Sequence, residues 1–366
     1  SLVEAARRCV DVSSTLVASA SIAEVHKLSL GKGRTVALKL QKPGLRRRFS
    51  VELRSLRWLA FWAARCEPTA PDFRRIVEEA YDTHLRELDF AAEARALEAA
   101  RRIVEAFSLD AVVPEPLRDV ADPSRNALAM EFCEGATVAR RTLDGTGVVL
   151  TDGTELGATA VRDVAEKLVD AYAAIFLVGG LVNQDPHGGN CLCQAYRDNG
   201  RVRARPVLLD FGMHAFLPDA QRLGFAALLV AVADDDLDGL AAALAALGVT
   251  SSFRTQHSMT HLSFLFRASD GNDAAAVDDF LDQFEEQTQL ATARAASANT
   301  RVVSGSEVFQ ALARQLDLLH GYVAFLPAPL DFLAVYAKWA RLALNEQKDR
   351  LLASSSVSSS EQQSVR

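Results

Sequence analysis

The sequence of 366 residues has little cysteine, and its cysteines do not form a recognisable pattern. Five are too few and too irregularly spaced for a disulfide framework, and the Cys-x-Cys pair lacks the spacer of a zinc knuckle. They are Cys9, Cys66, Cys133, Cys191 and Cys193. We therefore expect reduced thiols in an intracellular compartment.

Long apolar runs and an excess of positive charge are also missing. No uninterrupted apolar segment reaches the roughly 18 residues that a membrane span requires. The net charge of −7 argues against a nucleic-acid backbone as the main partner. With 49% hydrophobic and 24% charged residues, the chain is globular and long enough for one large core or two lobes. It begins with Ser1 and shows no targeting segment, so we expect a processed or truncated start.

Two short stretches carry oxygen-bearing side chains whose order along the chain is informative about function. Residues 182–190 read Val-Asn-Gln-Asp-Pro-His-Gly-Gly-Asn, and residues 207–212 read Val-Leu-Leu-Asp-Phe-Gly. Asp185, Asn190 and Asp210 are the donor types that suit a phosphate-bound Mg²⁺ and an attacking hydroxyl. An Asp, an Asn five positions later, and then an apolar strand ending in Asp-Phe-Gly follow the order of the protein-kinase catalytic and metal loops.

A glycine-rich phosphate loop is absent upstream, where small residues of another kind take its place. Residues 16–28 predict two extended segments around a turn whose backbone N–H groups could face phosphate oxygens. Alanine disfavours positive φ, so this loop should be stiffer than its glycine counterpart. Taken alone, the stretch fits an ordinary hairpin equally well. The candidate nucleotide-binding residues here are Ala18, Ser19, Ala20, Ser21, Ile22 and Ala23.

A strand is predicted at residues 35–41, directly after a Gly-Lys-Gly-Arg turn. Its alternation places Val36, Leu38 and Leu40 on one face and Ala37, Lys39 and Gln41 on the other. Ala37 could then lie against a purine ring while Lys39 reaches the α- and β-phosphates.

Two helices are predicted next, at residues 45–65 and about 72–107. The second carries Glu87, Asp89 and Glu93, of which Asp89 and Glu93 share a face one turn apart. Acidic residues on a helix usually form a solvated face, but apolar neighbours indicate partial burial here, where an unpaired charge is costly. One of these carboxylates should pair with Lys39, and the periodicity does not decide which.

The remaining segments predict a lobe boundary and a mostly helical second half. Strands are expected at 112–117 and 127–132, the second containing Met130 and Glu131 and leading into a hinge at 133–135. A loop insertion at 140–157, a helix at 158–178 and an Asn-Gly hairpin at 194–205 should follow. Helical patterns then occupy 220–247, 277–298 and 308–352, and the Ser-rich tail at 354–366 should be disordered.

Taken together, these motifs resemble the UbiB-like, aarF-domain (ADCK) family of atypical kinases over roughly residues 15–345. The resemblance implies an alanine-rich nucleotide loop at residues 18–23, a phosphate-binding Lys39 and a Glu-x-Asp motif at Glu87 and Asp89. It assigns Glu93 as the partner of Lys39, Asp185 and Asn190 to the catalytic loop, and Asp210 to the metal. Since every ligand position is filled, an inactive pseudokinase is not expected.

The resemblance implies an α+β, two-lobed protein-kinase-like fold that binds ATP and Mg²⁺. The expected domains are the end of a helical extension at 1–14, an N-lobe at 15–134, a C-lobe at 135–353 and the tail at 354–366. The implied activity is phosphoryl transfer or ATP hydrolysis linked to isoprenoid-quinone or lipid metabolism. Partners would be a nucleotide, an isoprenoid lipid or a quinone-biosynthesis protein, and a membrane surface bound peripherally, with no nucleic acid. A mitochondrial or plastid location follows if the source is eukaryotic.

Two departures from the family pattern stand out. The Lys-x-Gly-Gln motif that pairs with Glu-x-Asp is not found, which we ascribe to truncation, and Gly188 replaces a proline of the catalytic loop, which should loosen it slightly. Two alternatives stay open. One is a non-catalytic, nucleotide-gated module that binds a lipid or a protein. The other is a small-molecule kinase of the aminoglycoside or choline type, which should carry a conventional phosphate loop and no Glu-x-Asp motif.

Overall fold

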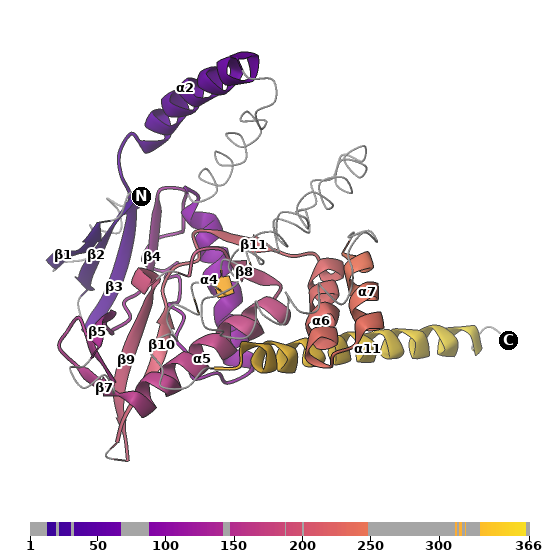
Figure 1. Cartoon of the computed structure of the whole chain (residues 1–366). Helices are drawn as coiled ribbons and strands as arrows, with labels where there is room; N and C mark the ends of the chain where they lie inside the picture. Colours follow the sequence, from indigo (N-terminus) through magenta and orange to yellow (C-terminus); the bar gives the residue numbers. More distant parts are fainter. Residues whose placement is uncertain are drawn as a thin grey trace. The chain divides into compact units, whose positions relative to one another are not determined.

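The computed structural model describes residues 13–19, 22–30, 33–66, 88–141, 147–186, 188–199, 201–247 and 330–363, with residues 312, 315, 316 and 319 (Figure 1). The chain divides into two compact units. Unit 1 comprises Ser1–Arg101, Val113–Glu134 and Leu209–His214, and unit 2 comprises Arg102–Val112, Gly135–Leu208 and Ala215–Arg366. One change of unit falls between Glu134 and Gly135, while the expected lobes at 15–134 and 135–353 stay a prediction. Segment 102–112 belongs to unit 2 although it lies within the N-terminal half of the sequence, and segment 209–214 belongs to unit 1 although it lies within the C-terminal half. A linear division of the sequence does not predict this.

An antiparallel sheet in the order β1-β2-β3-β4 organises unit 1. Its strands are β1 (Ser13–Ser19), β2 (Ala23–Leu30), β3 (Arg34–Gln41) and β4 (Ala127–Glu131). In the register of β3 and β4, Lys39 faces Leu128 and Ala37 faces Met130. Val36 and Leu38 pack with Ala129 on the apolar face, as the alternation predicts. Lys39 therefore projects from the opposite face.

Two helices are described after β3, of which α2 belongs to unit 1 and α4 passes from unit 1 into unit 2 after Arg101. Helix α2 (Leu45–Cys66) agrees closely with the predicted helix. It buries Leu53 and Ala60 while leaving Trp58 and Trp62 largely exposed. Helix α4 (Phe90–Ala106) forms the described part of the second predicted helix, with Ala94, Leu97 and Ala100 fully buried. Residues 67–87 lie outside the described part of the chain.

In unit 2, helix α5 (Ala158–Leu177) packs against a hairpin of β9 (Cys191–Asp198) and β10 (Arg201–Leu208). Every residue of α5 from Ala171 to Leu177 is buried, which explains its strongly apolar sequence. The hairpin turns at Asn199 with φ 49°, the left-handed conformation that an Asn-Gly turn predicts. A second small sheet pairs β8 (Leu181–Asn183) with β11 (His214–Phe216).

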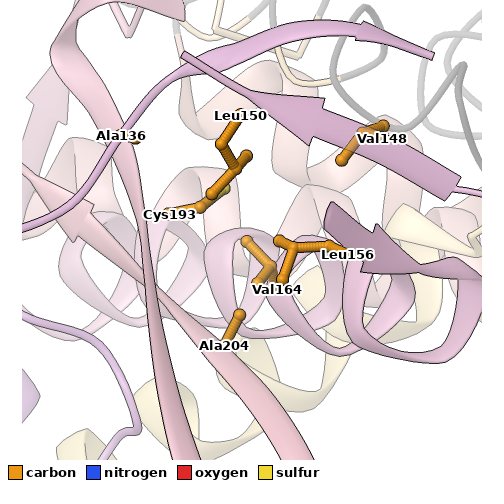
Figure 2. Packing of buried hydrophobic residues seen from close by; sticks show 7 residues of the cluster. All are labelled: Ala136, Val148, Leu150, Leu156, Val164, Cys193 and Ala204. Carbon is orange, nitrogen blue, oxygen red and sulfur yellow. The ribbon is translucent and has the colours of Figure 1, made fainter. Parts of the chain in front are cut away.

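The predicted loop insertion at 140–157 is wrong in part, because it contains most of a three-stranded antiparallel sheet. Strands β5 (Val138–Arg141), β6 (Gly147–Leu150) and β7 (Glu155–Gly157) pair in the order β5-β6-β7. Gly and Thr suggested a loop, but Val148 and Leu150 pack on α5 at Val164, and this burial stabilises short strands that local sequence does not (Figure 2). The cluster of buried residues in Figure 2 comprises Ala136, Val148, Leu150, Leu156, Val164, Cys193 and Ala204.

Three further helices are seen in the described part of unit 2. They are α6 (Asp219–Ala233), α7 (Leu237–Ala246) and α11 (Phe332–Gln363), and α11 packs against both α5 and α6 (Figure 1). Asp236 caps α7 by accepting a hydrogen bond from Gly239 N at 2.9 Å. No helix among the described residues is long and apolar enough to cross a membrane.

Two other expectations differ from the structure. Residues 112–117 make only single bridges, Val112 to Val207 and Pro116 to Met130, because Pro114 and Pro116 cannot donate to a strand ladder. Helix α11 extends to Gln363 and so includes most of the tail that composition predicts to be disordered. Serine costs only a few tenths of a kcal/mol per residue, roughly, so an established helix can propagate through it. The predicted helix at 277–298 lies outside the described residues, as does most of the one at 308–352.

Candidate functional site

A buried lysine bridges two carboxylates in unit 1. The Nζ atom of Lys39 donates to Glu93 Oε1 at 2.7 Å and to Asp210 Oδ2 at 2.9 Å. Glu93 is 1% exposed and Lys39 is 7% exposed, so this ion pair lies in the interior of the unit. The structure thereby brings together three of the residues that the sequence singles out, from β3, from the first turn of α4 and from the Asp-Phe-Gly segment.

Local geometry explains how Lys39 and Asp210 are oriented toward each other. The β3 alternation directs Lys39 away from the apolar face, and Phe90, which is fully buried, lies 5.2 Å from its Nζ. Asp210 is oriented by the following residues, because Gly212 N donates to its Oδ1 at 2.6 Å. A Cβ at Gly212 would stand 3.0 Å from that same oxygen, so glycine lets the backbone approach the carboxylate closely.

The three ionisable groups shift one another's pKa. Burial alone would lower the pKa of Lys39, but the adjacent charges of Asp210 and Glu93 outweigh it and raise that pKa above its usual value. Burial raises the pKa of Glu93 to about 7, with the charge of Asp210 adding to the rise and Lys39 opposing it. Burial also acts to raise the pKa of Asp210, but Lys39 and the Gly212 N–H reverse the effect and lower it.

The charge balance of this trio fits a bound cation. Two carboxylates and one ammonium leave a surplus of one negative charge when all three are ionised. Glu93 Oε2 is buried and has no hydrogen-bond partner within the described part of the structure. Among the described residues, no group of three or more His, Cys, Asp or Glu could hold a metal ion by itself. This donor set suits Mg²⁺, which takes one or two protein oxygens and completes its shell from phosphate and water.

Asp89 has a structural role that the sequence analysis missed. Its Oδ1 accepts hydrogen bonds from Ala91 N at 3.2 Å and Ala92 N at 3.3 Å, so it is the N-cap of α4. The sequence does indicate this role, because an Asp directly before an apolar run is typical of a helix N-cap. Its carboxylate is directed at the helix end, and of Asp89 and Glu93 it is Glu93 that is bonded to Lys39. Glu87, the other residue of the Glu-x-Asp motif, lies outside the described residues.

The predicted nucleotide-binding residues are only partly described. Ala18 and Ser19 end β1 and are exposed, whereas Ile22 and Ala23 are buried at the start of β2. Ala20 and Ser21, at the turn itself, lie outside the described residues. Ala37 and Met130 are buried cross-strand neighbours. Glu131 N donates to Glu115 O at 2.8 Å, and Glu131 Oε2 accepts from Arg101 Nη1 at 3.2 Å.

The catalytic-loop candidates Asp185 and Asn190 belong to unit 2, where they lie on one short loop. Asn190, in a 3₁₀ turn (Gly188–Asn190), donates from Nδ2 to Asp185 O at 3.4 Å. The backbone N–H of Asp185 donates to Asn183 Oδ1 at 2.9 Å. Asn183 is 1% exposed, and sequence reasoning missed it, although an Asn two residues before an Asp is typical of an Asx turn.

Comparison with known proteins identifies the family. The model of the ABC1 atypical kinase-like domain matches residues 10–244, which is well over half of the chain. The chain belongs to this family. The resemblance drawn from the motifs is thereby confirmed, and the chain contains an atypical kinase-like domain.

Curated members of the family match the chain over part of their length. "AarF domain-containing protein kinase 1" of Gallus gallus is 30% identical over 228 residues, which is 62% of this chain and 41% of that protein. "Protein ACTIVITY OF BC1 COMPLEX KINASE 8, chloroplastic" of Arabidopsis thaliana is 29% identical over 239 residues, 64% of this chain and 29% of that protein. The matched region therefore spans well under half of these relatives.

A solved structure supports the fold. The chain is similar to the protein in "The complex structure of Rv3197-erythromycin from Mycobacterium tuberculosis", with a TM-score of 0.58 and 18% identity, over 90% of this chain and 77% of that one. At this identity the likeness concerns the fold alone. The family member thus has the expected α+β, kinase-like architecture, with a β-rich unit and a larger, mostly helical one.

Proposed function

We propose that this family member binds ATP with Mg²⁺ and transfers or hydrolyses the γ-phosphoryl group. The observation that carries the proposal is the buried contact of Lys39 with both Glu93 and Asp210. A lysine held by a helix glutamate beside an Asp-Phe-Gly aspartate is the constellation with which kinases hold nucleotide phosphates and metal. A purely structural ion pair would not need two carboxylates for one lysine.

In this proposal each residue has a separate task. Lys39 neutralises charge on the α- and β-phosphates while Glu93 fixes the orientation of its ammonium group. Asp210 and Asn190 hold Mg²⁺, which supplies charge neutralisation at the phosphates when bound. Asp185 orients the attacking hydroxyl and accepts its proton. The small-residue loop at 18–23 and the segment at Ala37, Met130 and Glu131 enclose the nucleotide.

Nucleotide binding tests the first half of the proposal. Isothermal titration with Mg²⁺-ATP should show saturable binding that Lys39→Ala and Asp210→Asn weaken by at least about 10-fold, since each removes a charged contact to phosphate or metal, worth about 1.5–3 kcal/mol. Lys27→Ala is the matched control, because Lys27 lies on the neighbouring strand and pairs with Glu134 on the surface at 3.3 Å. If both site variants bind as the wild type does, the site assignment fails.

Phosphate release tests the second half and separates an enzyme from a nucleotide-gated binding module. Asp185→Asn should lower turnover by about 10²–10⁴-fold, the range for loss of a general base, while nucleotide affinity changes little. Asp198→Asn, at the exposed hairpin tip, is the control. Saturable nucleotide binding without turnover, unchanged by Asp185→Asn, would favour the non-catalytic module.

We extend the proposal to a phosphoryl acceptor or target in isoprenoid-quinone or lipid metabolism, with peripheral membrane association and a mitochondrial or plastid setting in a eukaryote. The support is the family membership together with the motif resemblance, and one relative is named chloroplastic. The test is the isoprenoid-quinone content of source cells that lack the protein. Wild-type protein should restore it and Asp185→Asn should not. Unchanged quinone levels on deletion would contradict this extension while leaving the nucleotide chemistry intact.

A further inference from the structure

Helix α6 contains a buried arginine that the nucleotide site does not explain. Arg222 is 7% exposed, and its Nη1 donates to the backbone oxygen of Leu177, the last residue of α5, at 2.8 Å. Its Nε and Nη2 both donate to Asp219 Oδ1, at 3.2 and 2.9 Å. An arginine buried to this degree, with most of its side chain away from water, needs specific partners to offset the cost.

The carbonyl that Arg222 binds lies at the end of the helix that leads into the catalytic loop. After Leu177 the chain turns at Gly179 and Gly180, runs through β8 and reaches Asp185. Gly180 has φ +65°, and a Cβ there would stand 3.2 Å from Arg222 Cδ, so the arginine stem packs directly on the turn. A cation at this position also satisfies the negative end of the helix dipole.

Hydrogen bonds anchor both this turn and the start of the Asp185 loop. Gly180 N donates to Phe176 O at 2.9 Å, and Gly180 O accepts from Leu217 N at 2.8 Å. Leu217 lies directly before Pro218, the N-cap of α6, so the residue that binds the turn leads straight into the helix that carries Arg222. At the far end of β8, Asn183 fixes the backbone of Asp185.

We infer that Arg222 is a positioning residue for the catalytic loop: by tying the end of α5 to α6, it sets where β8 begins and hence where Asp185 is held. This inference rests on the proposed function of Asp185. The short segment from Val178 to Gln184 joins the end of α5 to Asp185, so a shift at its start moves Asp185. Misplacement of a reacting group by about 1 Å can cost roughly 100-fold in rate.

The inference predicts a pattern that a merely structural arginine would not give. Arg222→Met keeps the apolar stem and removes every hydrogen bond, so turnover should fall by about 10- to 100-fold. Arg222→Lys keeps the charge and one contact to Leu177 O, and should recover most of that loss. The dissociation constant of Mg²⁺-ATP should rise by a smaller factor than turnover falls in both variants, because Lys39 and Asp210 lie outside this segment, whereas Asn190 lies on the same loop as Asp185.

Two control variants separate position from stability. Asp219→Asn removes the carboxylate partner but leaves the contact to Leu177 O, so its turnover should stay within about 3-fold of wild type. Arg341→Met removes an exposed arginine of the same unit, paired with Asp234, and should leave turnover unchanged.

Hydrogen exchange followed by mass spectrometry provides a readout independent of activity. The peptide covering residues 178–186 should exchange faster in Arg222→Met than in wild type, while the peptide over β9 should not change. Normal turnover in folded Arg222→Met, or an unchanged exchange rate at 178–186, would overturn the inference. If Arg222→Met does not fold, Arg222→Lys decides: it must show a turnover loss that exceeds any loss of nucleotide affinity. A wild-type protein without turnover would refute the proposed function itself, which is a different result.

Discussion

Removing Lys39 should destabilise the protein far more than neutralising Glu93, although the two residues form one ion pair. Lys39→Met leaves the buried Glu93 and the half-buried Asp210 with no ammonium between them. Breaking a buried pair in this way typically costs about 3–5 kcal/mol. Glu93→Gln instead removes the surplus negative charge, leaves Asp210 as counterion for Lys39 and keeps an acceptor oxygen. Its cost should stay near the net worth of one hydrogen bond, about 1 kcal/mol.

The double variant sharpens this prediction. In Lys39→Met/Glu93→Gln the half-buried Asp210 is the carboxylate of this trio left without the lysine, whereas Lys39→Met alone also leaves the fully buried Glu93. The double variant should therefore be more stable than Lys39→Met, by about 1–2 kcal/mol given typical couplings of contacting residues. Lys27→Met is the control for loss of a strand lysine, and its surface pair with Glu134 should be worth about 1 kcal/mol or less.

Pulse proteolysis across a urea series measures these differences. With a slope of about 2–3 kcal/mol per molar urea, Lys39→Met should lower the midpoint by about 1–2 M and Glu93→Gln by less than about 0.5 M. Mass spectrometry of the fragments assigns the transition to unit 1. Equal midpoints for Lys39→Met and Glu93→Gln, or a double variant less stable than Lys39→Met, would refute the surplus-charge reasoning.

Three further predictions concern single contacts. Asp89→Ala should lower the free energy of unfolding by about 0.5–2 kcal/mol through loss of the α4 cap, and Asp89→Ser should restore most of it; an equal loss in both variants would exclude capping. Gly212→Ala should weaken Mg²⁺-ATP binding measured by titration, because its Cβ would crowd Asp210 Oδ1. Burial acts to raise the pKa of Asp110, but hydrogen bonds from Lys167 and Tyr196 outweigh it and lower that pKa. Asp110 therefore stabilises the fold above its unfolded pKa, and this contribution is lost as pH falls. Asp110→Asn should destabilise the protein at pH 7. The difference in unfolding free energy should begin to fall near about pH 4, where unperturbed aspartate titrates, and should vanish only below the lowered pKa of Asp110 in the folded state.

The sequence could predict the parts of the site that follow from local periodicity. Alternation along β3 directs Lys39 away from Val36 and Leu38, and this is how the strand packs. Periodicity in α4 could not decide between Asp89 and Glu93, since both occupy one face. The decision comes from where the helix begins: with Phe90 as the first helical residue, Asp89 turns its carboxylate back to the helix amides, and only Glu93 is left to meet Lys39. The position of the helix start thus decides which carboxylate pairs with Lys39, and helix boundaries are the least predictable feature of a helix.

The contacts that no local pattern could reveal are those that join distant segments. Val148 and Leu150 form strands where glycine and threonine indicate a loop, because α5 and the β9 and β10 hairpin supply the apolar surface that they bury. Arg222 meets a helix end 45 residues earlier in the chain. Its sequence neighbours indicate only an amphipathic helix, on which an arginine should face water. Burying an arginine is costly unless hydrogen-bond partners compensate for the lost water. Arg222 can therefore be buried because the α5 carbonyl binds it and the glycine turn packs against its stem. The same partners connect it to Asp185, so the burial of one cation on α6 and the placement of the catalytic loop have a single physical cause.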